Sequence, residues 1–190
     1  MARRFRTLLA PIAAPLAAVL LLSPPASSQM LDATAFRASA IDDFQRMRGN
    51  VLQIVDAMPD SALHFMPTPG VRNFAEQIEH VVVGNVNIVA SGVDADRIPL
   101  GDKSVYLNDK AELRAFVNRG FDRVREILEG MEDAELQEEG SLFGQIPTPK
   151  WKIVELAYEH GVWTMGSLVP YMRLNGVTPP SYGLVPGGGM

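Results

Sequence analysis

Two segments of this sequence each carry a histidine followed by small or polar residues at matching offsets. These offsets, 0, 4, 7 and 11, fall on one side of an α-helix, so two helices could turn their polar lines toward each other. Neutral imidazoles bind divalent metals, and hydroxyl and amide groups orient small molecules. The pattern therefore predicts an interior pocket between two helices. The two lines are His80, Gly84, Asn87 and Ser91, and His160, Thr164, Ser167 and Tyr171.

An ordinary structural role competes with this interpretation. A buried histidine in an apolar helix is more often a hydrogen-bonded core residue than a ligand, and the other polar residues could be satisfied groups in a helix interface. We expect His64, in a proline-rich linker, at the surface or in packing, and Trp151 and Trp163 in the core or a pocket wall. The residues expected to contact a small molecule are Asn87, Trp163, Thr164, Ser167 and Tyr171.

Both polar lines belong to predicted helices, in which apolar residues recur at spacings of three and four. The sequence predicts helices from about Asp32 to Met58, Asn73 to Ser91, Asp109 to Leu128, and Thr148 to Asn175. Proline, glycine and asparagine are concentrated in the linkers between them.

The predicted helix ends rest on local signals. Asn73 with Glu76 has the spacing of a capping box, and Asp109 with Glu112 repeats it. For the last helix we expect Thr148 as the cap. Gly176, after Asn175, would end that helix.

Little in the sequence favours strands, and one proline should distort the last helix. The best strand candidate, SLFGQI at 141–146, is short and lies between helices. Pro170 cannot donate a backbone hydrogen bond and would clash with the Gly166 carbonyl, so we expect a kink there. The sequence therefore predicts an all-α fold, an up-down four-helix bundle.

The N-terminal segment has the pattern of a secretory signal peptide. Three arginines precede an apolar run from Leu8 to Leu22, and the small residues Ala26 and Ser28 follow at positions that suit signal peptidase. An uncleaved anchor is the alternative, although the run is short and contains prolines. We expect export to the periplasm or the extracellular space, without a stable membrane span after cleavage. The predicted organisation is a signal peptide at 1–28, one helical domain at 29–182 and a flexible tail at 183–190.

Charge and cysteine content exclude several classes of function. Without the three N-terminal arginines the chain has 14 basic and 22 acidic side chains, a formal net charge of about −8. Nucleic acid is therefore not an expected partner. The chain has no cysteine, which excludes disulfides, thiolate metal sites and cysteine nucleophiles. Any metal must use histidine, carboxylate or hydroxyl ligands.

Two phrases in the sequence carry a family resemblance. The stretch FMPTPGVRNF at 65–74, followed by His80, and the stretch YMRLNGVTPP at 171–180 are similar to motifs of the DinB-like superfamily of four-helix-bundle proteins. The resemblance extends from about Asp32 to Tyr182 and implies homodimers as a common assembly. It also implies a divalent metal held by three histidines, of which His80 and His160 match two.

The third of these ligand positions is occupied differently in this chain. Thr164 stands where the resemblance implies a histidine, and Ser167 stands where it implies a glutamine. Two histidines can bind zinc or nickel, but they leave an open and weaker site than three.

Three functional hypotheses follow from these observations. The first is an exported, non-catalytic bundle whose degenerate metal pocket binds a small ligand or serves a structural role. The second, implied by the resemblance, is a metal-dependent hydrolase or thiol S-transferase with zinc or nickel on His80 and His160, although export argues against a cytosolic thiol substrate. The third is a b-type haem between His80 and His160, or a methionine such as Met165.

Overall fold

The computed structural model describes residues 31–96 and 99–182. The predicted signal peptide and the predicted tail at 183–190 lie outside the described residues. The described part belongs to a single compact unit that begins at Leu31. It is mainly helical, as the sequence predicts. Its long helices are α1 (Ala33–Ala57), α2 (Phe74–Gly92), α4 (Lys110–Gly130) and α5 (Lys150–Gly166).

Shorter elements connect the long helices. One of them, α3, forms a single helical turn in the connection between α2 and α4, which the sequence did not predict. The short elements are the 3₁₀ turn η1 (Asp60–Ala62), α3 (Lys103–Tyr106), the 3₁₀ turn η2 (Glu135–Gln137), the strands β1 (Glu139–Leu142) and β2 (Ile146–Pro149), and α6 (Leu168–Leu174).

Side-chain caps fix the beginnings of the first three long helices. The Asn73 side chain accepts a hydrogen bond from the Glu76 amide at 2.9 Å, and Glu76 accepts one from the Asn73 amide at 2.9 Å, which confirms the capping box. Asp32 and Asp109 each accept from the amide three residues on. Each of these bonds satisfies a donor that the first helical turn would otherwise leave unpaired.

The expected cap of the last long helix is wrong by one residue. Pro149 occupies the cap position of α5 and makes no side-chain cap bond. Thr148 instead pairs in β2, where its hydroxyl donates to the Ile146 carbonyl at 3.1 Å.

A small antiparallel hairpin precedes α5 in this mainly helical fold. Its register pairs Glu139 with Pro149 and Leu142 with Ile146. The turn has positive φ at Phe143 (54°) and Gly144 (69°). The segment 141–146, the best strand candidate of the sequence, therefore straddles this turn, with Leu142 paired to Ile146.

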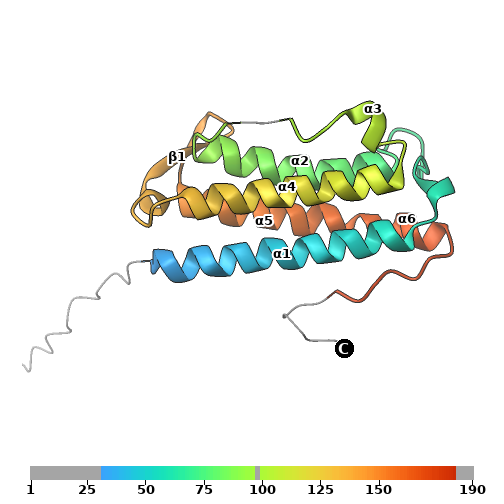
Figure 1. Ribbon diagram of the computed structural model, residues 1–190, viewed down its shortest axis with the longest axis horizontal. Coiled ribbons are helices and arrows are strands. Elements are labelled where there is room, and N and C mark those ends of the chain that lie inside the picture. The colour runs from blue at the N-terminus through green and yellow to red at the C-terminus, as the bar shows by residue number, and fades with distance from the viewer. Residues whose placement is uncertain (1–30, 97–98, 183–190) are drawn as a thin grey trace, which may run out of the picture. The chain divides into compact units, whose positions relative to one another are not determined.

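The helix order also differs from the predicted up-down arrangement. In Figure 1, α1 and α5 run from left to right, whereas α2 and α4 both run from right to left. Contacts agree with this parallel pair: Tyr106 joins Glu79 of α2 to Phe116 of α4, and Val82 lies against Gly120 one turn further along both helices. The long connection between α2 and α4 permits the return that a parallel pair needs.

That connection is held against α4 by arginines. Arg119 donates to the Leu100 carbonyl at 2.6 Å, and Arg123 donates to the Asp96 carbonyl at 2.9 Å. These bonds satisfy carbonyls of an irregular segment and fix it along the helix.

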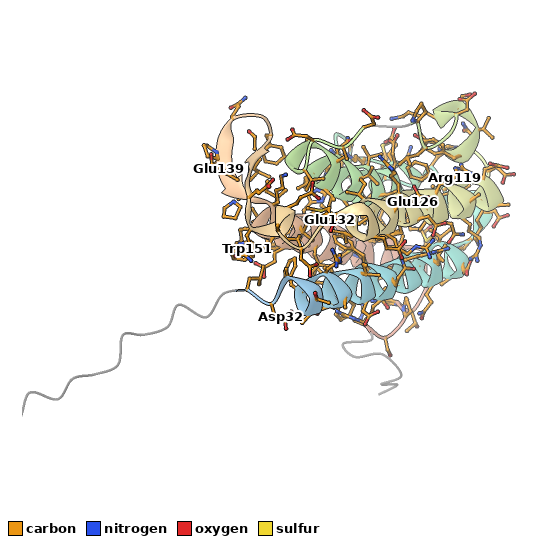
Figure 2. The ribbon with its side chains drawn as sticks, turned by 60° about the vertical axis from the view of Figure 1, so that its left-hand side comes forward. Asp32, Arg119, Glu126, Glu132, Glu139 and Trp151 are labelled. Atoms are coloured by element: carbon orange, nitrogen blue, oxygen red, sulfur yellow. The ribbon has the colours of Figure 1, made fainter. Side chains whose placement is uncertain are left out.

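The core lies where α2 packs against α4 and α5, and α1 packs against the same two helices. The predicted apolar face of α1 is buried, with Phe44, Met47 and Val51 almost completely inaccessible. Trp151, in the first turn of α5, lies at the end of the helices where α1 begins (Figure 2). It packs edge-on against Phe36, with ring centroids 6.3 Å apart. In the described ranges, no helix is both long and apolar enough to cross a membrane.

The last predicted helix is interrupted beside its polar line. α5 ends at Gly166, Ser167 follows, and α6 begins at Leu168. Pro170 lacks the N–H that would bond the Gly166 carbonyl, so the discontinuity lies where the sequence predicts a kink. α6 ends before Asn175, and Gly176 has a φ of +71°.

Candidate functional site

His80 and His160 face each other between α2 and α5. Their ring centroids are 5.1 Å apart and the ring planes meet at 81°, an edge-to-face contact. A methyl group on Gly84 would overlap Cε1 of His160 and lie 2.8 Å from both of its ring nitrogens. The space at Gly84, one turn beyond His80, is therefore filled by the imidazole of the opposite helix.

Asn85 positions His160, and the sequence prediction missed it. Nδ1 of His160 lies 3.4 Å from Oδ1 of Asn85, and the Asn85 amide group donates to Sδ of Met47 at 3.2 Å. Asn85 is only 1% exposed. Gly161 allows this approach, because a Cβ there would lie 2.7 Å from Nδ2 of Asn85. An amide within the apolar stripe of α2 was the available signal in the sequence.

Asn87 does not make the hydrogen bond across the pocket that the sequence suggested. Its carbonyl accepts from the Ser91 hydroxyl at 2.6 Å, which keeps Ser91 on its own helix. Between the described side chains, no hydrogen bond joins Asn87 to α5.

The polar line of α5 and α6 is hydrogen-bonded within the interface. The Thr164 hydroxyl, 7% exposed, donates to the His160 carbonyl at 2.7 Å. The Ser167 hydroxyl donates to the Thr164 carbonyl at 2.6 Å and accepts from the Gln77 amide group at 2.9 Å. The Tyr171 hydroxyl donates to the Arg72 carbonyl at 2.7 Å. Gln77 is a second buried amide that the sequence prediction did not include.

The two imidazoles are held toward their neutral form. Burial lowers the pKa of both histidines below the usual value of 6.5, and the positive charge of Arg72 lowers both further. For His80 the neighbouring His160 acts in the same direction, and Glu79 opposes it. Neutral imidazoles can accept a hydrogen bond or donate a lone pair to a metal.

Of the other residues considered, Trp163 and His64 are exposed, and the two carboxylates next to the histidines in the sequence have partners elsewhere or face solvent. Trp163 is 82% exposed, so its expected place in the core or a pocket wall is wrong. His64 is exposed, in agreement with its predicted surface position. Glu79 accepts from Tyr106 at 2.7 Å and from Lys103 at 2.8 Å, and Glu159 is exposed.

The residues present do not fit a metal held by a complete set of protein ligands. The two imidazoles supply half of a four-coordinate zinc site, and Thr164 directs its hydroxyl into its own helix. Over residues 31–96 and 99–182, no group of three or more histidine, cysteine, aspartate or glutamate side chains could hold a metal ion.

A groove of about 680 Å³ adjoins the polar line. Arg72 and Gln77 line it from the start of α2, and Ser167 and Tyr171 line it from the end of α5 and from α6. The groove combines one guanidinium with hydroxyl and amide groups, which suits a small polar molecule.

Comparisons with known proteins agree with this fold. The sequence model of the DinB superfamily matches residues 43–181. No curated protein matches the chain.

Two solved structures have a similar fold. A DinB-like protein from Bacillus cereus ATCC 10987 shares 17% identity at a TM-score of 0.65, over 76% of this chain and 95% of the other. A DinB-like protein from Bacillus subtilis shares 19% identity at a TM-score of 0.61, over 76% and 96%. Since the family match spans well over half of its residues, the chain belongs to the DinB superfamily.

Proposed function

We propose that this chain is an exported, non-catalytic four-helix bundle that binds a small polar ligand beside His80 and His160. The observation that carries the proposal is the hydrogen bond of the Thr164 hydroxyl within its own helix. Thr164 occupies the position where the family resemblance implies a third metal ligand, and its hydroxyl is committed to the His160 carbonyl at 2.7 Å. The pocket thus keeps its two imidazoles and lacks the set of ligands that metal catalysis would require.

The surrounding groups favour a ligand with hydrogen-bond acceptors. Arg72 supplies a positive charge in the adjoining groove, with the Gln77 amide group nearby. Both imidazoles have a lowered pKa and stay neutral at neutral pH, so the positive charge beside them comes from Arg72. A carboxylate would pair with the guanidinium through charge-assisted hydrogen bonds.

Metal content separates this proposal from catalysis by a bound metal. The chain, purified without chelator and analysed by mass spectrometry, should contain zinc and nickel well below one ion per molecule. The variants His80→Ala and His160→Ala should not change that content. Stoichiometric metal that both variants lose would contradict the proposal.

Benzoate is a suitable probe of the binding function itself. In a titration followed by amide chemical shifts, benzoate should perturb Arg72, Gln77 and Ser167. The change Arg72→Gln should weaken binding, whereas Arg173→Gln, an exposed arginine of α6 outside the groove, should leave it unchanged. Equal binding by both variants would show that the groove does not use its guanidinium.

A metal-dependent hydrolase or thiol S-transferase is the second candidate. The 5.1 Å spacing of the imidazoles favours it, because two imidazoles bound to one ion at about 2.0–2.1 Å hold their rings at a comparable separation. Stoichiometric zinc or nickel would support this candidate.

The haem candidate has less support. Axial ligands lie on opposite faces of the macrocycle, and the edge-to-face contact of His80 with His160 leaves no room between them. Met165 is buried and lines a different cavity.

A further inference from the structure

A separate cavity of about 230 Å³ lies between α1, α5, α6 and the segment that follows α6. Its wall is mostly apolar, and no charged side chain of the described residues lines it. The cavity shares no lining residue with the groove beside Arg72. Its apolar contacts come chiefly from Ile54, Val162, Met165, Val169, Pro179 and Pro180.

Asn50 places a polar group in this apolar wall. Its side chain is 8% exposed, and its Nδ2 is buried without a hydrogen-bond partner among the described residues. A buried donor without an acceptor is destabilising, and such groups are rare in native proteins. Asn50 lines the cavity, but its Nδ2 is turned away from accessible space, so a rotation of the side-chain amide is needed to bring this donor to an acceptor on a molecule inside.

The outer wall is a short extended segment fixed at its end. The hydroxyl of Tyr182 lies 3.4 Å from that of Tyr158 and 3.5 Å from Nη1 of Arg46, so the segment is attached to both α5 and α1. The adjacent Pro179 and Pro180 restrict its backbone. One wall of the cavity is therefore formed by chain that lies outside the helices.

We propose that this cavity binds a small, uncharged, mainly apolar molecule with one hydrogen-bond acceptor, such as a ketone or an ether oxygen, that pairs with Nδ2 of Asn50. A cavity of about 150 Å³ is sufficient for benzene, so this one has room for a ring with a short substituent. A charged ligand does not fit, because nothing in the wall would compensate its lost hydration.

Acetophenone and ethylbenzene form a matched pair of probes, since they share a ring and a two-carbon substituent and differ in the carbonyl oxygen. Titration of the isotope-labelled chain with each should perturb the amide resonances of Asn50, Val162 and Gly166. We expect acetophenone to bind at least about fivefold more tightly, which corresponds to about 1 kcal/mol. Its addition should also shift the side-chain amide resonances of Asn50.

Substitutions then test the donor and the cavity separately. Asn50→Leu should keep ethylbenzene binding and remove the preference for acetophenone. Gln53→Leu, at an exposed position of α1, should leave the preference intact. Ile54→Trp should fill the cavity and prevent binding of both probes, and Val169→Trp serves the same purpose if thermal melting shows that the first variant does not fold.

Three results would overturn the proposal. One is the absence of binding by either probe, which would indicate that water alone satisfies Asn50. Another is a preference for acetophenone that survives in Asn50→Leu. The third is binding that persists in both folded cavity-filling variants.

Discussion

At the scale of single residues, the site depends on close approaches that only glycine permits. His160 lies over Gly84, and its partner Asn85 lies over Gly161. The His160 imidazole is thus partly buried and has Asn85 as a hydrogen-bond partner, and both features restrict its motion. Burial in turn lowers its pKa and keeps it neutral at physiological pH.

Gly84→Ala should therefore destabilise the protein and displace His160. We expect a loss of about 1–3 kcal/mol in the free energy of unfolding, because the added methyl overlaps a ring held by its neighbours. The matched control is Gly49→Ala in α1, where nothing lies within 4 Å and the change should stabilise the protein by up to about 1 kcal/mol. Urea unfolding measures both variants, and equal effects would show that His160 does not occupy this space.

The histidine pair also predicts a pH dependence. In the unfolded chain both histidines bind a proton near the usual pKa of 6.5, whereas in the folded chain their pKa is lower. The free energy of unfolding should therefore fall as the pH drops below about 6.5, until the pH reaches the lowered pKa values of the folded chain. In metal-free protein, the wild type should lose more stability between about pH 7.5 and 5.5 than the double variant His80→Gln, His160→Gln. An identical pH dependence of the two proteins would contradict the lowered pKa values.

At the scale of elements, helix ends decide where the site residues lie. The capping box fixes the first turn of α2, and through it the register of Gln77 and His80. The discontinuity at Ser167 allows its hydroxyl to contact Gln77, and α6 then brings Tyr171 to the Arg72 carbonyl. Much of the predicted polar line therefore forms hydrogen bonds that join α2 and the segment before it to the end of α5 and to α6.

Asn73→Ala should lower the free energy of unfolding by about 1 kcal/mol, because the Glu76 amide loses its acceptor. The double variant with Glu76→Ala should cost less than the sum of the two single changes, since the two bonds support one helix end. Chemical denaturation of the three variants measures this coupling. Strict additivity would show that the two bonds act independently.

Local sequence signals predicted most of the helices, and the differences between the predicted and the observed structure have physical causes. Periodicity and caps located α1, α2 and α4 within a few residues, and Pro170 indicated the break before α6. The direction of α4 was not predictable from its own pattern, because a helix has the same apolar stripe in either direction. The site was predicted in part: the His80–His160 contact follows from helical spacing, whereas Asn85 and Gln77 are recognisable only once the packing of α2 on α5 is known.

At the scale of the whole molecule, the chain combines the DinB fold with a polar groove and a separate apolar cavity. The polar groove is lined by Arg72, Gln77, Ser167 and Tyr171, and the segment that follows α6 forms one wall of the apolar cavity. Homodimer formation stays a prediction. Export also stays a prediction, and it bears on the function because it determines which small molecules the pockets meet.

Export can be tested on the chain that includes residues 1–28. In a bacterial host with a general secretion pathway, the protein should accumulate outside the cytoplasm with an N-terminal sequence that starts at Gln29, because Ser28 suits the peptidase. Replacing the apolar run with charged residues should retain the full-length chain in the cytoplasm. Cytoplasmic accumulation of the unchanged chain, with residues 1–28 intact, would contradict the prediction.

The central claim is that Thr164 prevents a strong metal site around two correctly placed imidazoles, and calorimetric zinc titration of Thr164→His tests it most directly. The account predicts that this variant binds one zinc ion at least about tenfold more tightly than the wild type. Trp163→His, which adds a histidine at the exposed neighbouring position, should bind no more tightly than the wild type. Stoichiometric, equally tight binding by the wild type, or no gain in Thr164→His, would contradict the account.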